Sequence, residues 1–168
     1  MMTIARTAAV KNIIPAGSKV KELRGNLNRL LAELPILMSE RFGNAGLDAV
    51  SEIFRRLGTR DAEAMKSRLG LGSGLRDALD AWLIIGNLLG SKIDVHWISD
   101  ERVETEHPYC PQHEEFVKRG KIYCDSVCIP YVSAIASGIA PNVSTEVVRN
   151  ADETHTCVKA LVLHGHET

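Results

Sequence analysis

The chain has 168 residues, of which 45% are hydrophobic and 24% charged, a composition typical of one folded domain rather than a disordered chain. Its formal net charge is −1, whereas nucleic-acid binders usually carry an excess of basic residues, so we expect no nucleic-acid partner. The longest charge-poor apolar stretch, residues 81–90, is too short to cross a bilayer, and the N-terminus lacks the apolar core of a secretory signal. We therefore expect a cytoplasmic protein that does not bind membranes.

The first ninety residues predict helices. Residues 1–17 show no clear period and are expected to form an N-terminal extension. The helix that follows has apolar residues every three or four positions, and Pro35 is expected to kink or break it. A second amphipathic helix is expected to end at Gly58, with a short helix after it. Residues 75–90 predict a strongly apolar helix around Trp82, which either packs in the core or offers a face to a homodimer.

The second half of the chain predicts strands in two hairpins. Apolar and polar residues alternate in 92–98 and again in 101–107, and the segment 107–111 is expected to leave the sheet because its prolines cannot donate to a strand ladder. A short helix is expected next, then a helix over 122–139, then strands at 143–149 and 156–164.

This order of elements predicts an α+β fold, with N-terminal helices packed on an antiparallel sheet built from two hairpins and an intervening helix. We expect a single domain over residues 18–168. It divides into a helical half, 18–90, and a sheet half, 91–168, which carries the cysteines and histidines.

Four cysteines within about fifty residues indicate a metal site or a reactive thiol in an intracellular chain, although a lone free cysteine is usually a small buried hydrophobe. Cys124 and Cys128 are four apart and would share one face of a helix. Cys157 opens the last strand, where Glu146 is expected as its neighbour across the hairpin. The predicted metal ligands are Cys110, Cys124, Cys128, Cys157 and Glu146, and the predicted metal is zinc, with iron as the second choice.

A thiol nucleophile is the alternative chemistry for the same cluster. A helix N-terminus would favour the thiolate of Cys124 or Cys128, and His113 or His155 would act as the base. Cys124 and His113 are therefore the predicted catalytic residues.

Two further residues are candidates for substrate binding. Arg149 could pair with a substrate carboxylate, and Tyr131 could line a pocket. The plainer interpretation of each is a solvated strand arginine and a core tyrosine, and it stays open here.

The layout of the second half resembles a known family. Helices leading to a strand, then Cys110-Pro111, then Cys124 before an apolar helix, then a strand pair with Cys157, are similar to the L-2-amino-thiazoline-4-carboxylate hydrolase-like family. The resemblance covers roughly residues 20–164. It implies a pocket between sheet and helices with cysteines at its edge, and an activity in which water opens a cyclic amidine-like thiazoline ring.

That family is related in layout to the 4-vinyl reductase small-molecule-binding domain. This second resemblance implies a ligand-sensing module in which cysteine and glutamate side chains hold zinc. Glu146 and Cys157 match that layout, whereas Arg149 stands where a second cysteine would be.

The sequence thus leads to two functional hypotheses. The first is a small hydrolase acting on a C–N bond of a cyclic amidine-like molecule, with the Cys/His cluster as a metal or thiol site. The second is a non-enzymatic, metal-stabilised module that binds a small molecule as a sensor or accessory domain. A third, plainer hypothesis makes the cysteines core residues only.

Overall fold

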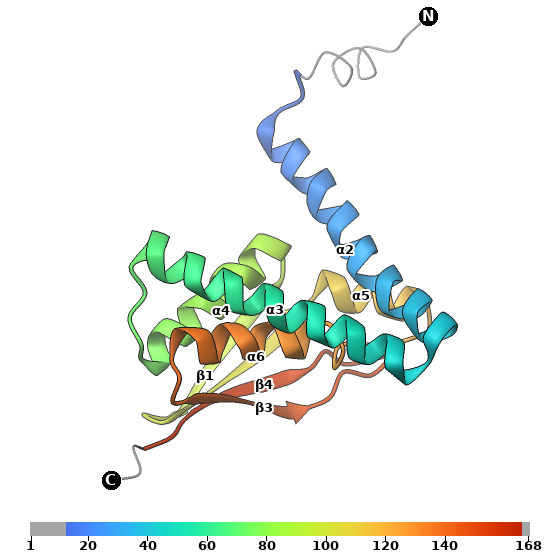
Figure 1. The fold of residues 1–168 in the computed structure, drawn as a ribbon. Coiled ribbons are helices and arrows are strands. Elements are labelled where there is room, and N and C mark those ends of the chain that lie inside the picture. The colour runs from blue at the N-terminus through green and yellow to red at the C-terminus, as the bar shows by residue number, and fades with distance from the viewer. Residues whose placement is uncertain (1–12, 166–168) are drawn as a thin grey trace, which may run out of the picture.

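The computed structural model describes residues 13–165, and Figure 1 shows its helices lying on one side of a four-stranded antiparallel sheet. The predicted α+β class, with N-terminal helices packed on two hairpins, is confirmed. Residues 1–12 of the predicted N-terminal extension lie outside the described residues. The elements are α2 (Ala16–Phe42), α3 (Asn44–Leu69), α4 (Leu75–Leu89), β1 (Lys92–Ser99), β2 (Arg102–Tyr109), α5 (Pro111–Lys118), α6 (Cys128–Ile139), β3 (Val143–Arg149) and β4 (Val158–Leu163).

The sheet has the order β1-β2-β4-β3, so the two hairpins join through β2 and β4. Thr105 on β2 is opposite Lys159 on β4, and Glu146 on β3 is opposite Ala160. Because successive side chains of a strand point to opposite faces, Glu146 and Lys159 lie on opposite sides of the sheet. Lys159 is on the side covered by the helices, whereas Glu146 is exposed and pairs with Arg102 at 2.7 Å.

Two clusters of buried side chains hold the helices in place. The larger lies between α4, α6 and the sheet, and the smaller lies between α2, α3 and α5. Trp82 is only 4% exposed, and its indole N–H donates to the carbonyl of Val132 at 2.8 Å, which joins α4 to α6. Trp82 therefore belongs to the core, and the homodimer stays a prediction from the sequence.

The helix α2 runs unbroken through Pro35, so the predicted break there is wrong. Pro35 is buried, and Leu34 and Met38 pack against the smaller cluster, so tertiary contacts offset the backbone hydrogen bond that a proline removes.

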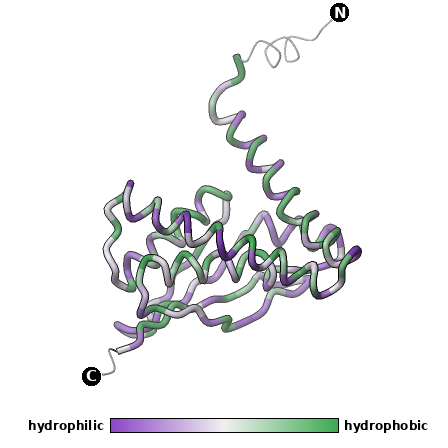
Figure 2. Tube along the Cα trace, viewed as in Figure 1, coloured by the Kyte–Doolittle hydropathy of each residue, from purple (hydrophilic) through white to green (hydrophobic). Residues whose placement is uncertain are grey.

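The first half of α2 projects from the body of the molecule (Figure 1), and hydrophobic residues recur along it (Figure 2). Leu23 and Leu30 in this part are 67% and 61% exposed. Among the described helices, none has the length and apolar character needed to cross a membrane.

The predicted end of a helix at Gly58 is also wrong, because α3 continues to Leu69. Gly58 is buried where α3 meets α6. A Cβ at this position would come within 2.9 Å of the Cβ of Ala134 and would also collide with the carbonyl of Tyr131. The glycine is therefore there to let two helices approach closely, not to end one.

The segment after the first hairpin differs from the prediction, because β2 keeps Pro108 inside the strand and ends at Tyr109. The pairing of β2 with β1 is irregular at this point, with a register shift between Lys92 and Asp94. A proline is tolerated beside such an irregularity, where its missing N–H interrupts no regular ladder.

The helix predicted over 122–139 is shorter than expected and begins at Cys128. Pro130 then falls in the first turn, where a helix leaves its backbone N–H groups without internal acceptors. Cys124 lies in the turn that precedes α6, so Cys124 and Cys128 do not share a helix face as predicted.

Candidate functional site

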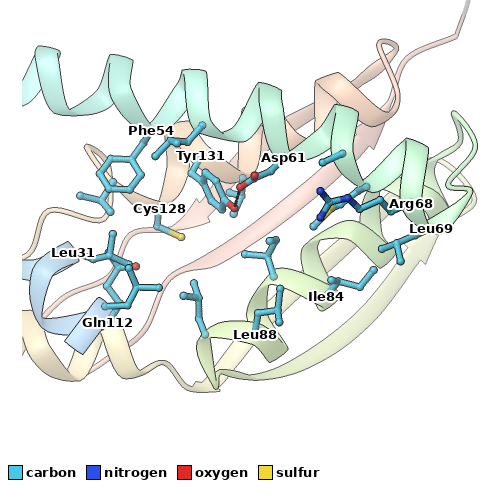
Figure 3. A pocket seen from close by; sticks show the side chains of 18 residues that line it. Leu31, Phe54, Asp61, Arg68, Leu69, Ile84, Leu88, Gln112, Cys128 and Tyr131 are labelled. Carbon is cyan, nitrogen blue, oxygen red and sulfur yellow. Dashed lines mark hydrogen bonds between the residues drawn. The ribbon is translucent and has the colours of Figure 1, made fainter. Parts of the chain in front are cut away.

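A cavity of about 610 Å³ lies between α2, α3, α4 and α6 (Figure 3). On α3 its wall includes Phe54, Leu57 and Asp61, whose spacing of three and four places them on one helix face. On α4 the wall includes Ile84 and Leu88, which are again four apart. The volume falls within the roughly 300–1,000 Å³ typical of small-molecule sites, and the lining is mostly aliphatic and aromatic.

A few polar groups interrupt the apolar wall of this cavity. The hydroxyl of Tyr131 donates a hydrogen bond to the carboxylate of Asp61. Burial and this bond raise the pKa of Tyr131, so the phenol is protonated at neutral pH. Figure 3 shows the sulfur of Cys128 pointing into the cavity and Arg68 at one end of it. Tyr131, predicted from the sequence as a substrate-binding residue, therefore lies in the cavity wall.

A second hollow of about 40 Å³ adjoins the first. We call it the polar chamber, after the side chains of Thr105, His107, Cys110, Gln112 and Lys159 in its wall. The two hollows are immediate neighbours, because five residues line both. The five shared residues are Ile85, Leu89, Gln112, Cys128 and Val132.

Lys159 is the buried basic residue of the chamber, with 1% of its surface exposed. Its ammonium donates to Nε2 of His107 at 3.0 Å and to Sγ of Cys157 at 3.2 Å, and it lies 5.9 Å from the centre of the Trp82 ring. Burial disfavours the ammonium, but the sulfur atoms of Cys128 and Cys157 beside it favour the charged form, and the pKa of Lys159 is raised overall. Burial, assisted by the nearby ammonium, lowers the pKa of His107 to about 3. At neutral pH the chamber therefore holds a lysine cation beside a neutral histidine.

The four cysteines are all free thiols grouped around this end of the fold. Cys110 and Cys128 line the chamber, Cys157 accepts the hydrogen bond from Lys159, and Cys124 is buried in the smaller core cluster. Burial raises the pKa of Cys110 and of Cys124, and it raises the pKa of Cys128 to about 12. These three are therefore protonated at neutral pH, which is the state of a structural cysteine rather than of an activated nucleophile.

The other residues predicted as functional lie outside both hollows. His113 donates its Nε2–H to the carbonyl of Asp152 at 2.7 Å, and His155 is exposed in the loop before β4. Arg149 is exposed on the sheet and forms an ion pair at 2.8 Å. Glu146 lies on the open face of the sheet. The structure thus brings Cys110, Cys128 and Tyr131 to the hollows and Cys157 next to Lys159, and it leaves Cys124 and these four side chains elsewhere.

Within residues 13–165, no group of three or more histidine, cysteine or acidic side chains is arranged to hold a metal ion. Glu146 is separated from Cys157 by the thickness of the sheet, because Cys157 shares the side of Lys159, to which it is bonded. The predicted zinc site stays a prediction without a matching ligand geometry in this part of the chain.

Reasoning from the sequence missed Lys159, His107, Gln112 and Asp61 as candidates. A lysine in a strand is usually solvated, and residues 158–163 are apolar in both phases of the alternation, so the buried phase was not evident. Lys159 lies two residues before Leu161, so the two side chains point to the same face of the sheet, and Leu161 is fully buried. This spacing is the signal in the sequence that could have identified Lys159.

Comparisons with known proteins agree on the fold. No family model matches the chain, and no curated protein does. The chain is similar to the structure of a trafficking protein particle complex subunit 3 from Naegleria fowleri covalently bound to palmitic acid. The TM-score is 0.64 at 14% identity, covering 86% of this chain and 97% of that one. It is also similar to the phenol-responsive sensory domain of the transcription activator PoxR with phenol, with a TM-score of 0.56 at 13% identity, covering 84% and 74%. At these identities the likeness establishes a shared fold.

Proposed function

We propose that this chain is a non-enzymatic binding module that holds an apolar small molecule in the cavity between its helices. The observation that carries the proposal is the cavity of about 610 Å³, whose wall is built from aliphatic and aromatic side chains of four helices. Polar groups are few there, as expected of a site in which burial of apolar surface supplies the affinity.

The two proteins of similar fold support the same class of ligand. One is described as covalently bound to palmitic acid and the other as bound to phenol. A long acyl chain and an aromatic ring are both apolar, and the cavity described above is lined to receive such groups. The proposal needs no bound zinc. A cytoplasmic location and a homodimer stay predictions from the sequence.

The hydrolase hypothesis has weaker support. Its predicted nucleophile, Cys124, is buried with a raised pKa, and its predicted base, His113, uses Nε2 to bond a backbone carbonyl. Nucleophilic catalysis needs a thiolate within hydrogen-bond reach of its base. A binding module needs only the cavity.

The binding proposal can be tested with N-phenyl-1-naphthylamine, an uncharged probe that fluoresces in apolar surroundings. We expect saturable binding to the purified chain. Ala64 lines the cavity on α3, so Ala64→Trp should fill part of it and weaken binding by at least about tenfold. The matched control is Ser67→Trp, one turn further along α3 at an exposed position outside the cavity wall, which should leave the affinity unchanged.

Two results would contradict the proposal. One is the absence of saturable probe binding to the folded chain. The other is equal probe affinity in Ala64→Trp and the unchanged protein, since that would place the probe outside the cavity.

A further inference from the structure

We propose that the polar chamber binds the carboxylate of an amphipathic ligand whose apolar tail occupies the adjoining cavity. The inference rests on the proposed function and deepens it, because it names the ligand class as an apolar monocarboxylate. It follows from three features of the chamber: an uncompensated buried cation, buried donors without acceptors, and a size and position that suit a small head group.

The first feature is the charge of Lys159. Its ammonium contacts the neutral ring of His107, the sulfur of Cys157 and the face of Trp82. Among residues 13–165 no carboxylate forms an ion pair with Lys159, although eleven other ion pairs occur there. A buried charge without a counter-ion is costly, and buried charges in proteins are normally paired. An anionic ligand would supply the missing partner.

The second feature is a pair of buried donors that lack acceptors. Lys159 donates to Nε2 of His107, so the neutral ring carries its proton on Nδ1, and Nδ1 has no hydrogen-bond partner. The amide nitrogen Nε2 of Gln112 is likewise buried and unpartnered. His107 and Gln112 are 9% and 5% exposed. Buried polar groups are nearly always bonded, so two orphan donors beside one cation indicate an absent acceptor.

The third feature is the size and place of the chamber. Its volume of about 40 Å³ compares with the roughly 10–15 Å³ that one enclosed water needs, so it has room for a group the size of a carboxylate. One lysine and two neutral donors suit a single negative charge better than the two charges of a phosphate ester. Gln112 and Cys128 line both hollows, so a tail attached to this head group would extend into the apolar cavity.

A competing anchor exists at the other end of the cavity. Figure 3 shows Arg68 and Gln112 at opposite ends, and the side chain of Arg68 is exposed. A carboxylate at Arg68 would remain partly hydrated, and exposed ion pairs add little to affinity. A carboxylate in the chamber would be surrounded by buried donors, where charge-assisted hydrogen bonds are stronger.

The test compares two ligands with the same tail and different heads, dodecanoate and dodecan-1-ol, by displacement of N-phenyl-1-naphthylamine. We expect dodecanoate to bind at least about tenfold more tightly than dodecan-1-ol. Lys159→Met keeps an unbranched side chain but removes the ammonium, so it should abolish this preference by weakening dodecanoate binding at least about tenfold. Arg68→Met is the matched control and should keep the preference.

A second variant tests the proposal independently if Lys159→Met does not fold. Gln112→Leu retains the cation and removes one donor, so it should reduce the preference for dodecanoate several-fold. Equal binding of the two ligands to the unchanged protein would overturn the chamber proposal and leave the proposed function intact. Loss of the preference in Arg68→Met but not in the two chamber variants would also overturn it. Failure of both ligands to displace the probe would contradict the proposed function as well.

Discussion

Lys159 and His107 form a buried pair in which only the lysine carries a charge. The ammonium donates to Nε2 of the imidazole, which keeps that nitrogen unprotonated. Protonation of His107 would place two cations 3.0 Å apart in a site shielded from water. The fold can accept that proton only at a high cost in free energy, which explains the direction of the shift of the His107 pKa.

This shift predicts that acid destabilises the fold through His107. The folded pKa is about 3, whereas an unfolded histidine titrates near 6.5. As the pH falls below about 6.5, His107 therefore binds a proton in the unfolded chain but not in the folded one. The free energy of unfolding decreases with falling pH until the pH reaches the folded pKa. Between about pH 6.5 and pH 5 this group should cost about 2 kcal/mol of unfolding free energy, measured by urea denaturation.

The matched variant for this prediction is His107→Gln, which can still accept a hydrogen bond from Lys159 but does not titrate. Its stability should decline less steeply over the same range. An identical slope in both proteins would show that carboxylates elsewhere, and not His107, cause the acid loss.

The thiol of Cys128 offers a second prediction at this scale. Its pKa is raised by burial to about 12, so the reactive thiolate fraction at neutral pH is very small. Alkylation of Cys128 by iodoacetamide in the folded protein should therefore be slow and should speed up about tenfold per pH unit between about pH 7 and pH 9. Peptide mass spectrometry gives the rate, and the urea-unfolded chain, whose rate levels off near pH 8.5, is the control. A rate in the folded protein that levels off below pH 8 would instead favour the thiol-nucleophile hypothesis.

At the scale of elements, the close approach of α3 and α6 sets the width of the cavity. Two glycines make it possible: Gly58 lies against Ala134, and a Cβ on Gly138 would come within 2.7 Å of the Cβ of Ala62. The bond between Tyr131 on α6 and Asp61 on α3 spans the same pair of helices inside the cavity. Helix packing and the binding site are therefore governed by the same contacts.

Gly58→Ala should destabilise the fold by about 1–3 kcal/mol, because the added methyl group collides with the carbonyl of Tyr131 and with Ala134. The control is the same substitution in α2, at Gly25, where the nearest atom to a new Cβ is 3.7 Å away on a flexible arginine. Gly25→Ala should stabilise by about 0.5–1 kcal/mol, since alanine favours helix. Thermal unfolding shows whether each variant is more or less stable than the unchanged protein. If Gly25→Ala destabilised the fold as much as Gly58→Ala, the packing argument would be contradicted.

The same elements show what a sequence can and cannot predict. The alternation in 92–98 and 101–107 arises from one buried and one solvated face, so the hairpins and the α+β class follow from the pattern. Pro35 and Gly58 mislead because their local preference for ending helices is overridden by contacts with distant segments. Lys159 escapes prediction for the same reason: its partner His107 is 52 residues away, and only the pairing of β2 with β4 brings them together.

For the whole molecule, the helices lie on one side of the sheet (Figure 1), and the cavity lies among those helices. Residues from helices between α2 and α6 contribute to its wall, so the site exists only when these helices are packed together. A ligand in this cavity is therefore bound by the folded state and not by the unfolded one, and ligand binding and global stability are linked.

This linkage predicts a rise in the thermal unfolding midpoint when an apolar ligand is added. A ligand at a hundred times its dissociation constant adds about 2.7 kcal/mol to the unfolding free energy. For a chain of 168 residues, that corresponds to about 5–10 °C. Calorimetry with dodecan-1-ol measures the shift, and Ala64→Trp, which narrows the cavity, should show a much smaller one. An equal shift in Ala64→Trp would mean that the alcohol stabilises the chain from another surface, such as the exposed leucines of α2, and would contradict a ligand site among the helices.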